Sequence, residues 1–239
     1  MADPALIEEG ERLATITGCN GCHGPTMAGK VFLDIPKVMR LIAPNLPALA
    51  QQASDADFVR AVRHGVRRDG RSVVGMPSVG LHHLTDRDLA AIIAYIRSRP
   101  VEADGTDEVN AYRIFARLGM ALGQFPLPAA EIQAGVEALP SRQSGDPAAL
   151  GAYVAAISCS DCHGTDLQGN PHLPAPSLAI VRGYSREQFE RLMREGLAVG
   201  GREVGLMSEV SRLHFSALTQ AEVDGLYAYL STMGAGGSD

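Results

Sequence analysis

The sequence contains no tryptophan, and its aromatic residues make up only 5% of the 239 positions. Aromatic side chains therefore contribute little to burying apolar surface unless a bound group adds to the core. An excess of positive charge is also missing, because the formal net charge is −6. Binding to nucleic acid needs a basic surface, so this charge argues against a nucleic-acid partner.

Long apolar runs are absent as well. The nearest approach to the ~20 apolar residues that cross a bilayer is the stretch 111–127, which Arg113 and Arg117 interrupt. The first residues, Met1 to Pro4, have neither the basic start nor the apolar run of a secretory signal. The sequence therefore predicts no transmembrane segment.

Cysteine is scarce, and its placement is the most informative feature of the chain. All four cysteines fall in two CxxCH motifs, Cys19 and Cys22 before His23, and Cys159 and Cys162 before His163. Two thiols three positions apart on one helical turn can form thioethers with the two vinyl groups of a haem, and the histidine that follows can bind the iron. The motifs therefore predict two covalently bound haems c.

Zinc sites and redox dithiols also use CxxC pairs. A thioredoxin-like dithiol needs a βαβ context, which this sequence does not show, and a zinc site made of all four cysteines would leave both histidines unexplained. Covalent haem attachment in bacteria normally takes place outside the cytoplasm. We therefore expect a periplasmic protein whose export signal has been removed and whose Met1 is an added residue.

The two motifs belong to an internal repeat. Residues 58–76, FVRAVRHGVRRDGRSVVGM, match residues 189–207, FERLMREGLAVGGREVGLM, at a constant offset of 131. The motifs are 140 residues apart and the Ala-Pro segments at Pro44 and Pro176 are 132 apart, so the first half holds about eight extra residues between these two features. Chance would not preserve this order and spacing, and the chain is predicted to contain two homologous domains.

Both halves show the same order of predicted helices, with apolar residues at helical spacing. Thr85 and Thr219, each followed three residues later by an acidic residue, mark the start of a final helix. No convincing alternating strand pattern is present, so the predicted fold is all-α. We expect a first domain over 1–100, a partly helical connecting segment over 101–146 and a second domain over 147–239. The predicted helices cover 4–17, 54–66, 85–99, 109–124, 147–158, 185–197 and 219–233.

A methionine in a glycine-rich loop follows the middle helix of each half. Met76 and Met207 occupy equivalent positions of the repeat, but only Met76 is followed by a proline. Thioether sulfur is a soft iron ligand that raises the reduction potential, and the glycines allow the loop to bend over a haem. We predict Met76 and Met207 as iron ligands opposite the motif histidines. The alternatives are packing of both methionines on the haem edge, or binding by His64, His82 or His83 in the first half and by Met193, His172 or His214 in the second.

Each half resembles a class I cytochrome c domain, with a helix, a CxxCH motif, a proline-containing loop, a methionine loop and a final helix that carries an aromatic residue. The whole chain resembles the bacterial di-haem cytochromes c over about residues 4–99 and 147–235. The resemblance implies that a glycine of the first helix contacts an aromatic residue of the last helix. The matching pairs are Gly10 with Tyr95 and Gly151 with Tyr229.

In the family that the chain resembles, a proline carbonyl orients the haem histidine and fixes its tautomer. Pro44 and Pro176 match this position. Arginines also gather near the two methionine loops, where they either pair with haem propionates or form a solvated charged surface, which is the interpretation that we favour for most of them. These arginines are Arg63, Arg67, Arg71, Arg194 and Arg202.

With a histidine and a methionine on each iron, neither haem would have an open position, so the predicted function is electron transfer and not catalysis. The expected donor is a periplasmic dehydrogenase, with this chain as its cytochrome subunit or its soluble acceptor, and the expected acceptor is a cytochrome or a terminal oxidase. One alternative is a di-haem enzyme with an open or displaceable iron site, such as a peroxidase or a thiosulfate-oxidising enzyme. Another is a gas or redox sensor, for which no output domain is visible.

Overall fold

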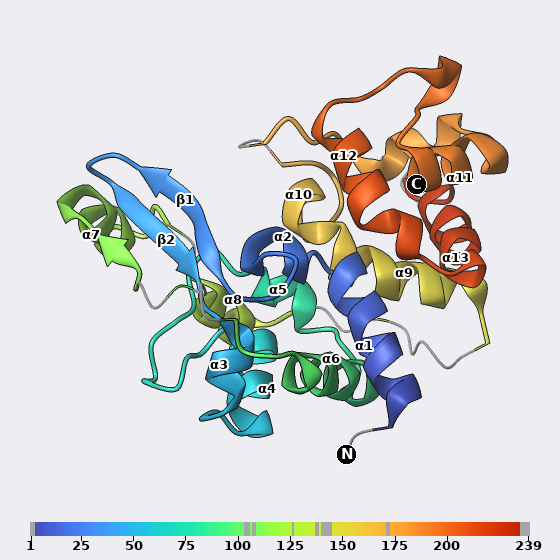
Figure 1. Cartoon of the computed structure of the whole chain (residues 1–239). Helices are drawn as coiled ribbons and strands as arrows, with labels where there is room; N and C mark the ends of the chain where they lie inside the picture. The colour runs from blue at the N-terminus through green and yellow to red at the C-terminus, as the bar shows by residue number, and fades with distance from the viewer. Residues whose placement is uncertain are drawn as a thin grey trace. The chain divides into compact units, whose positions relative to one another are not determined.

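The computed structural model describes residues 3–102, 106, 109–125, 127–136, 139, 145–170 and 173–234. The chain forms two compact units (Figure 1): Met1–Ala14 with Gly18–Val136, here unit 1, and Thr15–Thr17 with Glu137–Asp239, here unit 2. Residues of the predicted connecting segment up to Val136 therefore belong to unit 1, while the domain limits at 100 and 147 stay predictions. None of the helices described has both the length and the apolar composition needed to cross a membrane.

Unit 1 is mainly helical, and its first and last long helices are in close contact. A Cβ atom placed on Gly10 would lie 2.0 Å from the carbonyl oxygen of Ala91 and 2.9 Å from Cβ of Tyr95, so only glycine permits this approach. The helices of unit 1 are α1 (Pro4–Ile16), α2 (Cys19–His23), α3 (Leu46–Ala50), α4 (Asp55–His64), α5 (Ser78–Leu81), α6 (Asp86–Ser98), α7 (Ile114–Ala121) and α8 (Pro128–Ala134).

Unit 2 repeats this contact between its own first and last helices. A Cβ atom on Gly151 would lie 1.9 Å from the carbonyl oxygen of Gly225 and 2.8 Å from Cβ of Tyr229. Both glycine–tyrosine contacts expected from the resemblance are therefore confirmed. The helices of unit 2 are α9 (Pro147–Ser158), α10 (Ser160–His163), α11 (Arg186–Glu195), α12 (Leu206–Leu213) and α13 (Gln220–Leu230), with 3-10 turns η1 (Leu178–Gly183), η2 (Val199–Gly201) and η3 (Phe215–Ala217).

The middle helices α4 and α11 begin and end in the same way. Each begins with a capping box, formed by Ser54 with Asp57 in α4 and by Ser185 with Gln188 in α11. Each ends at a glycine in the left-handed conformation, Gly65 at φ 62° and Gly196 at φ 72°. The predicted starts of the final helices are also confirmed, because the hydroxyls of Thr85 and Thr219 accept hydrogen bonds from the backbone N–H groups three residues later.

The mostly helical fold is confirmed, but the expectation of no strands is wrong for part of unit 1. Strand β1 (Lys30–Ile35) pairs antiparallel with β2 (Met39–Ala43), which pairs antiparallel with β3 (Ala111–Tyr112). The β1–β2 hairpin lies where the first half holds its extra residues. It escaped prediction because β1 is half-buried to exposed along its length and four of the five residues of β2 are buried, so neither strand alternates between apolar and polar residues.

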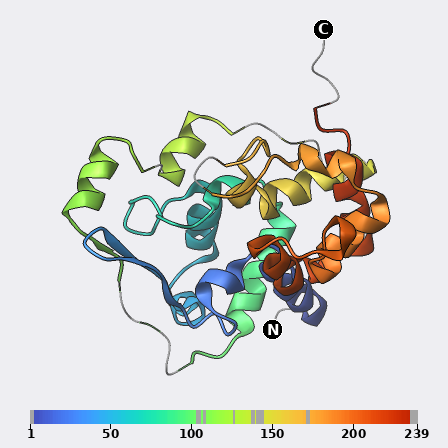
Figure 2. The same cartoon turned by 90° about the horizontal axis from the view of Figure 1, so that it is seen from above.

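A small apolar core joins the hairpin to α7. Met39 and Leu41 of β2 and Ala116 of α7 are buried together, with Phe32 and Phe125 packed against them. Figure 1 shows α7 beside the outer end of the hairpin, away from α3 and α4, and Figure 2 again shows it next to the hairpin. The predicted helix over 109–124 begins only at Ile114 because the residues before it form β3.

Candidate cofactor sites

Each CxxCH motif forms one short helical turn directly after the first helix of its unit. In unit 1 the turn is α2, preceded by Gly18 at φ 73°, and in unit 2 it is α10, in which the His163 N–H donates to the Cys159 carbonyl at 3.0 Å. Positions three apart on a helical turn lie on neighbouring sides of it. The local structure therefore gives the two thiols of each motif the arrangement that attachment to one ring requires.

A proline carbonyl contacts each motif histidine, as the resemblance implies. Nδ1 of His23 lies 2.9 Å from the Pro44 carbonyl oxygen, and Nδ1 of His163 lies 2.7 Å from that of Pro176. A carbonyl oxygen can only accept, so Nδ1 carries the proton in both rings and Nε2 has a free lone pair. Within the described residues, neither Nε2 atom has a hydrogen-bond partner.

The environment of His23 favours the neutral ring. Burial lowers the pKa of His23 below its usual value and outweighs the opposite effect of the hydrogen bond to Pro44. A neutral imidazole whose second nitrogen is held by a carbonyl is the usual form of a histidine that binds a metal. The histidines and thiols of the two motifs therefore fit the donor set that a covalently bound haem needs.

The loops after the two motifs follow one backbone path, which the sequence alone did not reveal. The N–H of Gly29 donates to the His23 carbonyl, and that of Gly169 to the His163 carbonyl, both at 2.8 Å. Met27 and Leu167 hold equivalent left-handed conformations at φ 62° and 59° and are buried. Such strain in a non-glycine residue persists only where the surroundings enforce it, so these residues help to fix the loop that follows each histidine. The 140-residue offset was the signal that relates them.

The thiols of the second motif do not resemble those of a redox dithiol. Burial raises the pKa of Cys159 to about 12, and burial followed by the charge of Asp161 raises the pKa of Cys162. Redox and zinc-binding cysteines instead depend on a lowered thiol pKa. In the part of the chain that the structure describes, no three His, Cys, Asp or Glu side chains gather as ligands of a single metal ion would.

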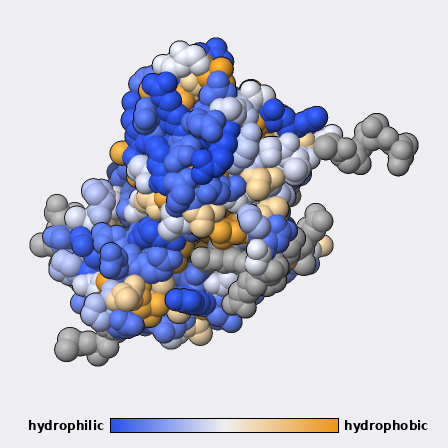
Figure 3. Space-filling model, turned by 90° about the vertical axis from the view of Figure 1, so that its right-hand side faces the viewer, coloured by the Kyte–Doolittle hydropathy of each residue, from blue (hydrophilic) through white to orange (hydrophobic). Residues whose placement is uncertain are grey.

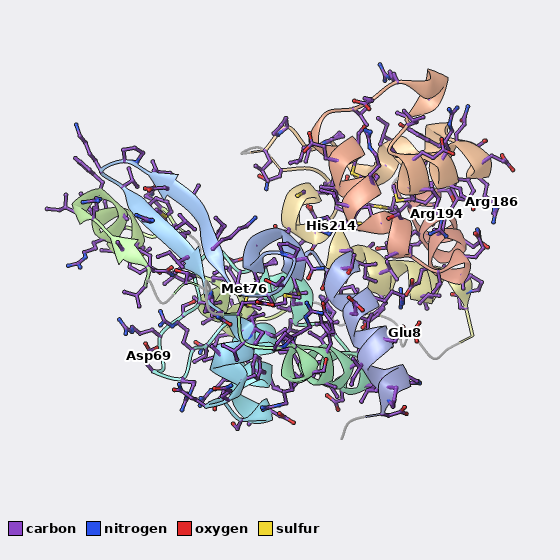
Figure 4. All side chains as sticks on the ribbon, viewed as in Figure 1. Glu8, Asp69, Met76, Arg186, Arg194 and His214 are labelled. Atoms are coloured by element: carbon purple, nitrogen blue, oxygen red, sulfur yellow. The ribbon has the colours of Figure 1, made fainter. Side chains whose placement is uncertain are left out.

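The two predicted methionine ligands lie in different local structures. Met76 lies in the loop that leads to α5 (Figure 4), beside Gly75 at φ 78°. Met207 instead lies in the first turn of α12, after Gly205 at φ 58°, so its prediction as a loop residue is wrong. The cause is the residue that follows: Pro77 disfavours helical backbone at Met76, whereas Ser208 allows the helix to begin at Leu206. The binding of either methionine to iron stays a prediction.

The alternative ligands of the first half lie together. The rings of His64 and His83 each lie 5.9 Å from that of His82, whose Nδ1 donates to the Arg63 carbonyl at 2.7 Å. In the second half Met193 is buried in α11, His214 follows α12, and His172 lies outside the described residues.

Four of the five arginines near the methionine loops bind protein groups. Arg63 pairs with Asp86 at 2.5 Å, and Arg67 and Arg71 lie near Asp69. Arg194 donates to two backbone carbonyls, one in η3 and one on the residue that follows η3. Figure 4 labels Asp69 and Arg194 on the ribbon. Arg202 alone among the five has no side-chain partner in the described regions, so it is the one that these contacts leave available to a propionate.

Comparison with known protein families gives two matches in tandem. The family of cytochrome c oxidase, cbb3-type, subunit III matches residues 5–96, and the cytochrome c family matches residues 148–234. Each match includes one CxxCH motif and one of the two methionines. Residues 97–147 lie outside both matches.

Several curated proteins are similar to this chain. The cytochrome c subunit of alcohol dehydrogenase (quinone) from Gluconacetobacter polyoxogenes is 31% identical over 39% of this chain and 22% of its own length. The fructose dehydrogenase cytochrome subunit from Gluconobacter japonicus is 22% identical over 96% of this chain and 53% of its own length. The gluconate 2-dehydrogenase cytochrome c subunit from Pantoea cypripedii is 32% identical over 40% of this chain and 23% of its own length. The chain thus spans only part of the length of these relatives.

Proposed function

This chain belongs to the cytochromes c and has two cytochrome c domains in tandem, and from this we propose that it is an electron-transfer protein. Each domain would carry one covalently bound haem c. The observation that supports this most is the same arrangement in both units, in which a proline carbonyl holds Nδ1 of the histidine that ends the CxxCH turn. Haem iron, when bound, supplies one-electron redox chemistry.

Different residues of each unit would hold different parts of the haem. Cys19 with Cys22, and Cys159 with Cys162, form the thioether links. Pro44 and Pro176 keep the proton on Nδ1 of the motif histidines, so that Nε2 would be the nitrogen that binds the iron. Met76 and Met207 would supply the second protein ligand of each iron, and their thioether sulfur would favour the reduced state and leave no open position for a substrate.

The relatives suggest the partners. Three proteins that are similar to this chain are named as cytochrome subunits of dehydrogenases. We infer that this chain accepts electrons, one at a time, from a dehydrogenase of which it is the cytochrome subunit, and passes them to a cytochrome or a terminal oxidase. Because haem c is attached outside the bacterial cytoplasm, the proposed location is the periplasm.

The test is spectroscopic and kinetic. Purified holo-protein should contain two haems per chain, both low-spin and both with a methionine bond to ferric iron. The catalytic subunit of an alcohol dehydrogenase (quinone), the kind of enzyme named for one relative, should reduce both haems in a stopped-flow experiment when it is supplied with its substrate. A high-spin haem that reacts with peroxide would instead favour the di-haem enzyme, and no reduction by the dehydrogenase would remove the proposed donor.

A further inference from the structure

On the face of the molecule in Figure 3, hydrophilic residues predominate and hydrophobic ones form small groups. On α7 and just after it, by contrast, Ile114, Phe115, Leu118 and Leu122 are all more than half exposed. Ala116 of the same helix is fully buried against the hairpin. One side of α7 therefore anchors it to unit 1, while the large apolar residues on its other sides remain mostly exposed.

The exposed apolar face of α7 belongs to a part of the chain that the haem domain does not need. Residues 30–43 and 109–125, here the lobe, comprise the hairpin, β3 and α7. Unit 2 holds its motif histidine by the same contacts with about eight fewer residues between its motif and its Ala-Pro segment. Residues 109–125 also lie outside both family matches. The exposed face is therefore an addition to a domain that is complete without it.

The charge of the lobe indicates what kind of surface it fits. The lobe holds five cationic side chains and a single carboxylate, Asp34, in a chain whose net charge is −6. The cations are Lys30, Lys37, Arg40, Arg113 and Arg117. A second copy related by a two-fold axis would bring these cations together, which disfavours self-association. An acidic surface is the complementary one.

The composition of the face also favours a protein over a lipid surface. Residues 109–125 include two phenylalanines, two arginines, a tyrosine and a methionine, and they include no lysine, aspartate or glutamate. Aromatic residues, methionine and arginine are enriched at protein interfaces, where lysine and acidic residues are depleted. We propose that the lobe is the docking surface for the dehydrogenase that donates electrons, and that the matching surface of the dehydrogenase is an apolar patch with acidic side chains around it. This inference rests on the proposed function.

The apolar part of the contact is tested with the double variant Phe115→Ser/Leu118→Ser. Both side chains are exposed, at 63% and 55%, so the fold should remain intact. The second-order rate of reduction by the same dehydrogenase subunit should fall about tenfold to a hundredfold. Ile180→Ser on η1 of unit 2, where the side chain is 54% exposed, is the matched control and should change the rate little.

The charged part is tested with Lys30→Glu/Arg113→Glu, which remains informative if the serine variant folds poorly. Reversing two charges should lower the association rate and weaken its dependence on ionic strength, whereas Arg182→Glu in unit 2 should do neither. Equal rates for wild type and both lobe variants would overturn the docking inference while leaving the proposed function intact. No reduction of the wild type would instead remove the proposed donor, on which this inference rests.

A chemical cross-link gives a third readout, because the only two lysines of the chain, Lys30 and Lys37, both lie in the lobe. A carbodiimide joins an amine directly to a carboxylate in contact with it. Mixing holo-protein with the dehydrogenase subunit should give amide links from these lysines to dehydrogenase carboxylates, and Lys30→Arg/Lys37→Arg should abolish them while keeping the charge. The inference is overturned if the face instead binds a second copy in sedimentation experiments, or if the serine variant loses binding only to phosphatidylglycerol vesicles.

Discussion

The motif histidines illustrate how one backbone atom decides the chemistry of a side chain. A ring with its proton on Nδ1 presents a lone pair at Nε2, and the carbonyls of Pro44 and Pro176 impose this tautomer in both units. Proline fits the position because its carbonyl remains a full acceptor while its ring restricts the backbone. The sequence resemblance identified both prolines, since they lie at matching positions of the repeat.

The iron ligands opposite these histidines can be tested residue by residue. Met76→Ala and Met207→Ala each remove one thioether and leave the CxxCH attachment unchanged. Each variant should keep both haems and lose about half of the absorption band that methionine bound to ferric iron produces. The measurement is the absorption spectrum of the oxidised protein.

The two variants also test the ligands of the two irons separately. Met76 precedes a proline in a loop, whereas Met207 lies in the first turn of α12, and the two haems need not have the same ligands. If Met207→Ala leaves the band unchanged, the second iron has a different ligand, and Met193 and His214 are the next residues to replace.

At the scale of elements, the capping boxes of α4 and α11 predict different responses to pH. The backbone N–H of Ser54, followed by its hydroxyl, lowers the pKa of Asp57 below the usual 3.8. A carboxyl group whose pKa is lower in the folded state stabilises the fold above its unfolded pKa, and this contribution disappears as pH falls through the folded pKa. Gln188 makes the equivalent contact in α11 without a titratable group.

Asp57→Ala should therefore lower the melting temperature by a few degrees at neutral pH, and the difference from wild type should shrink as the pH falls below 3.8, the usual pKa of an aspartate. Gln188→Ala should cause a decrease that stays constant over the same range. Thermal unfolding followed by circular dichroism measures both. Parallel pH profiles for the two variants would show that Asp57 does not act through its charge.

The helix crossings predict a strong effect of a single methyl group. Gly151→Ala places a Cβ atom within 1.9 Å of the Gly225 carbonyl oxygen, so α9 and α13 must move apart. Overpacking of this kind costs about 1–3 kcal/mol, which chemical denaturation of the holo-protein should detect. Gly183→Ala is the control, because its Cβ atom would have no neighbour within 4 Å. Equal stability of the two variants would mean that the helices of unit 2 separate without cost.

The sequence predicted the long helices and the cofactor motifs, because these depend on local spacing. Thr219 with Glu222 marked a helix start, and the repeat placed equivalent residues in register. The hairpin was missed because its strands do not alternate and are held by pairing with each other and with residues near 111, which sequence spacing does not reveal. The helical position of Met207 was missed for a local reason, the serine that stands where the first repeat has Pro77.

At the scale of the molecule, the two units should load and hold their haems independently. Each has its own CxxCH turn, its own proline contact and its own crossing of first and last helices. Each domain is small, so a haem would provide much of its apolar core. The variant Cys159→Ala/Cys162→Ala should therefore contain one haem per chain, and Cys19→Ala/Cys22→Ala should contain the other.

The first of these variants should also keep the methionine–iron band and the reduction potential of the haem in unit 1, while unit 2 loses most of its cooperative unfolding because the group that fills its core is missing. Haem content is measured from the pyridine haemochrome spectrum, potentials by redox titration and unfolding by calorimetry. A chain that still binds two haems would show that the second CxxCH does not attach one. Loss of both haems from either variant would show that the two units fold as a single cooperative domain, and the tandem arrangement would then be one of sequence only.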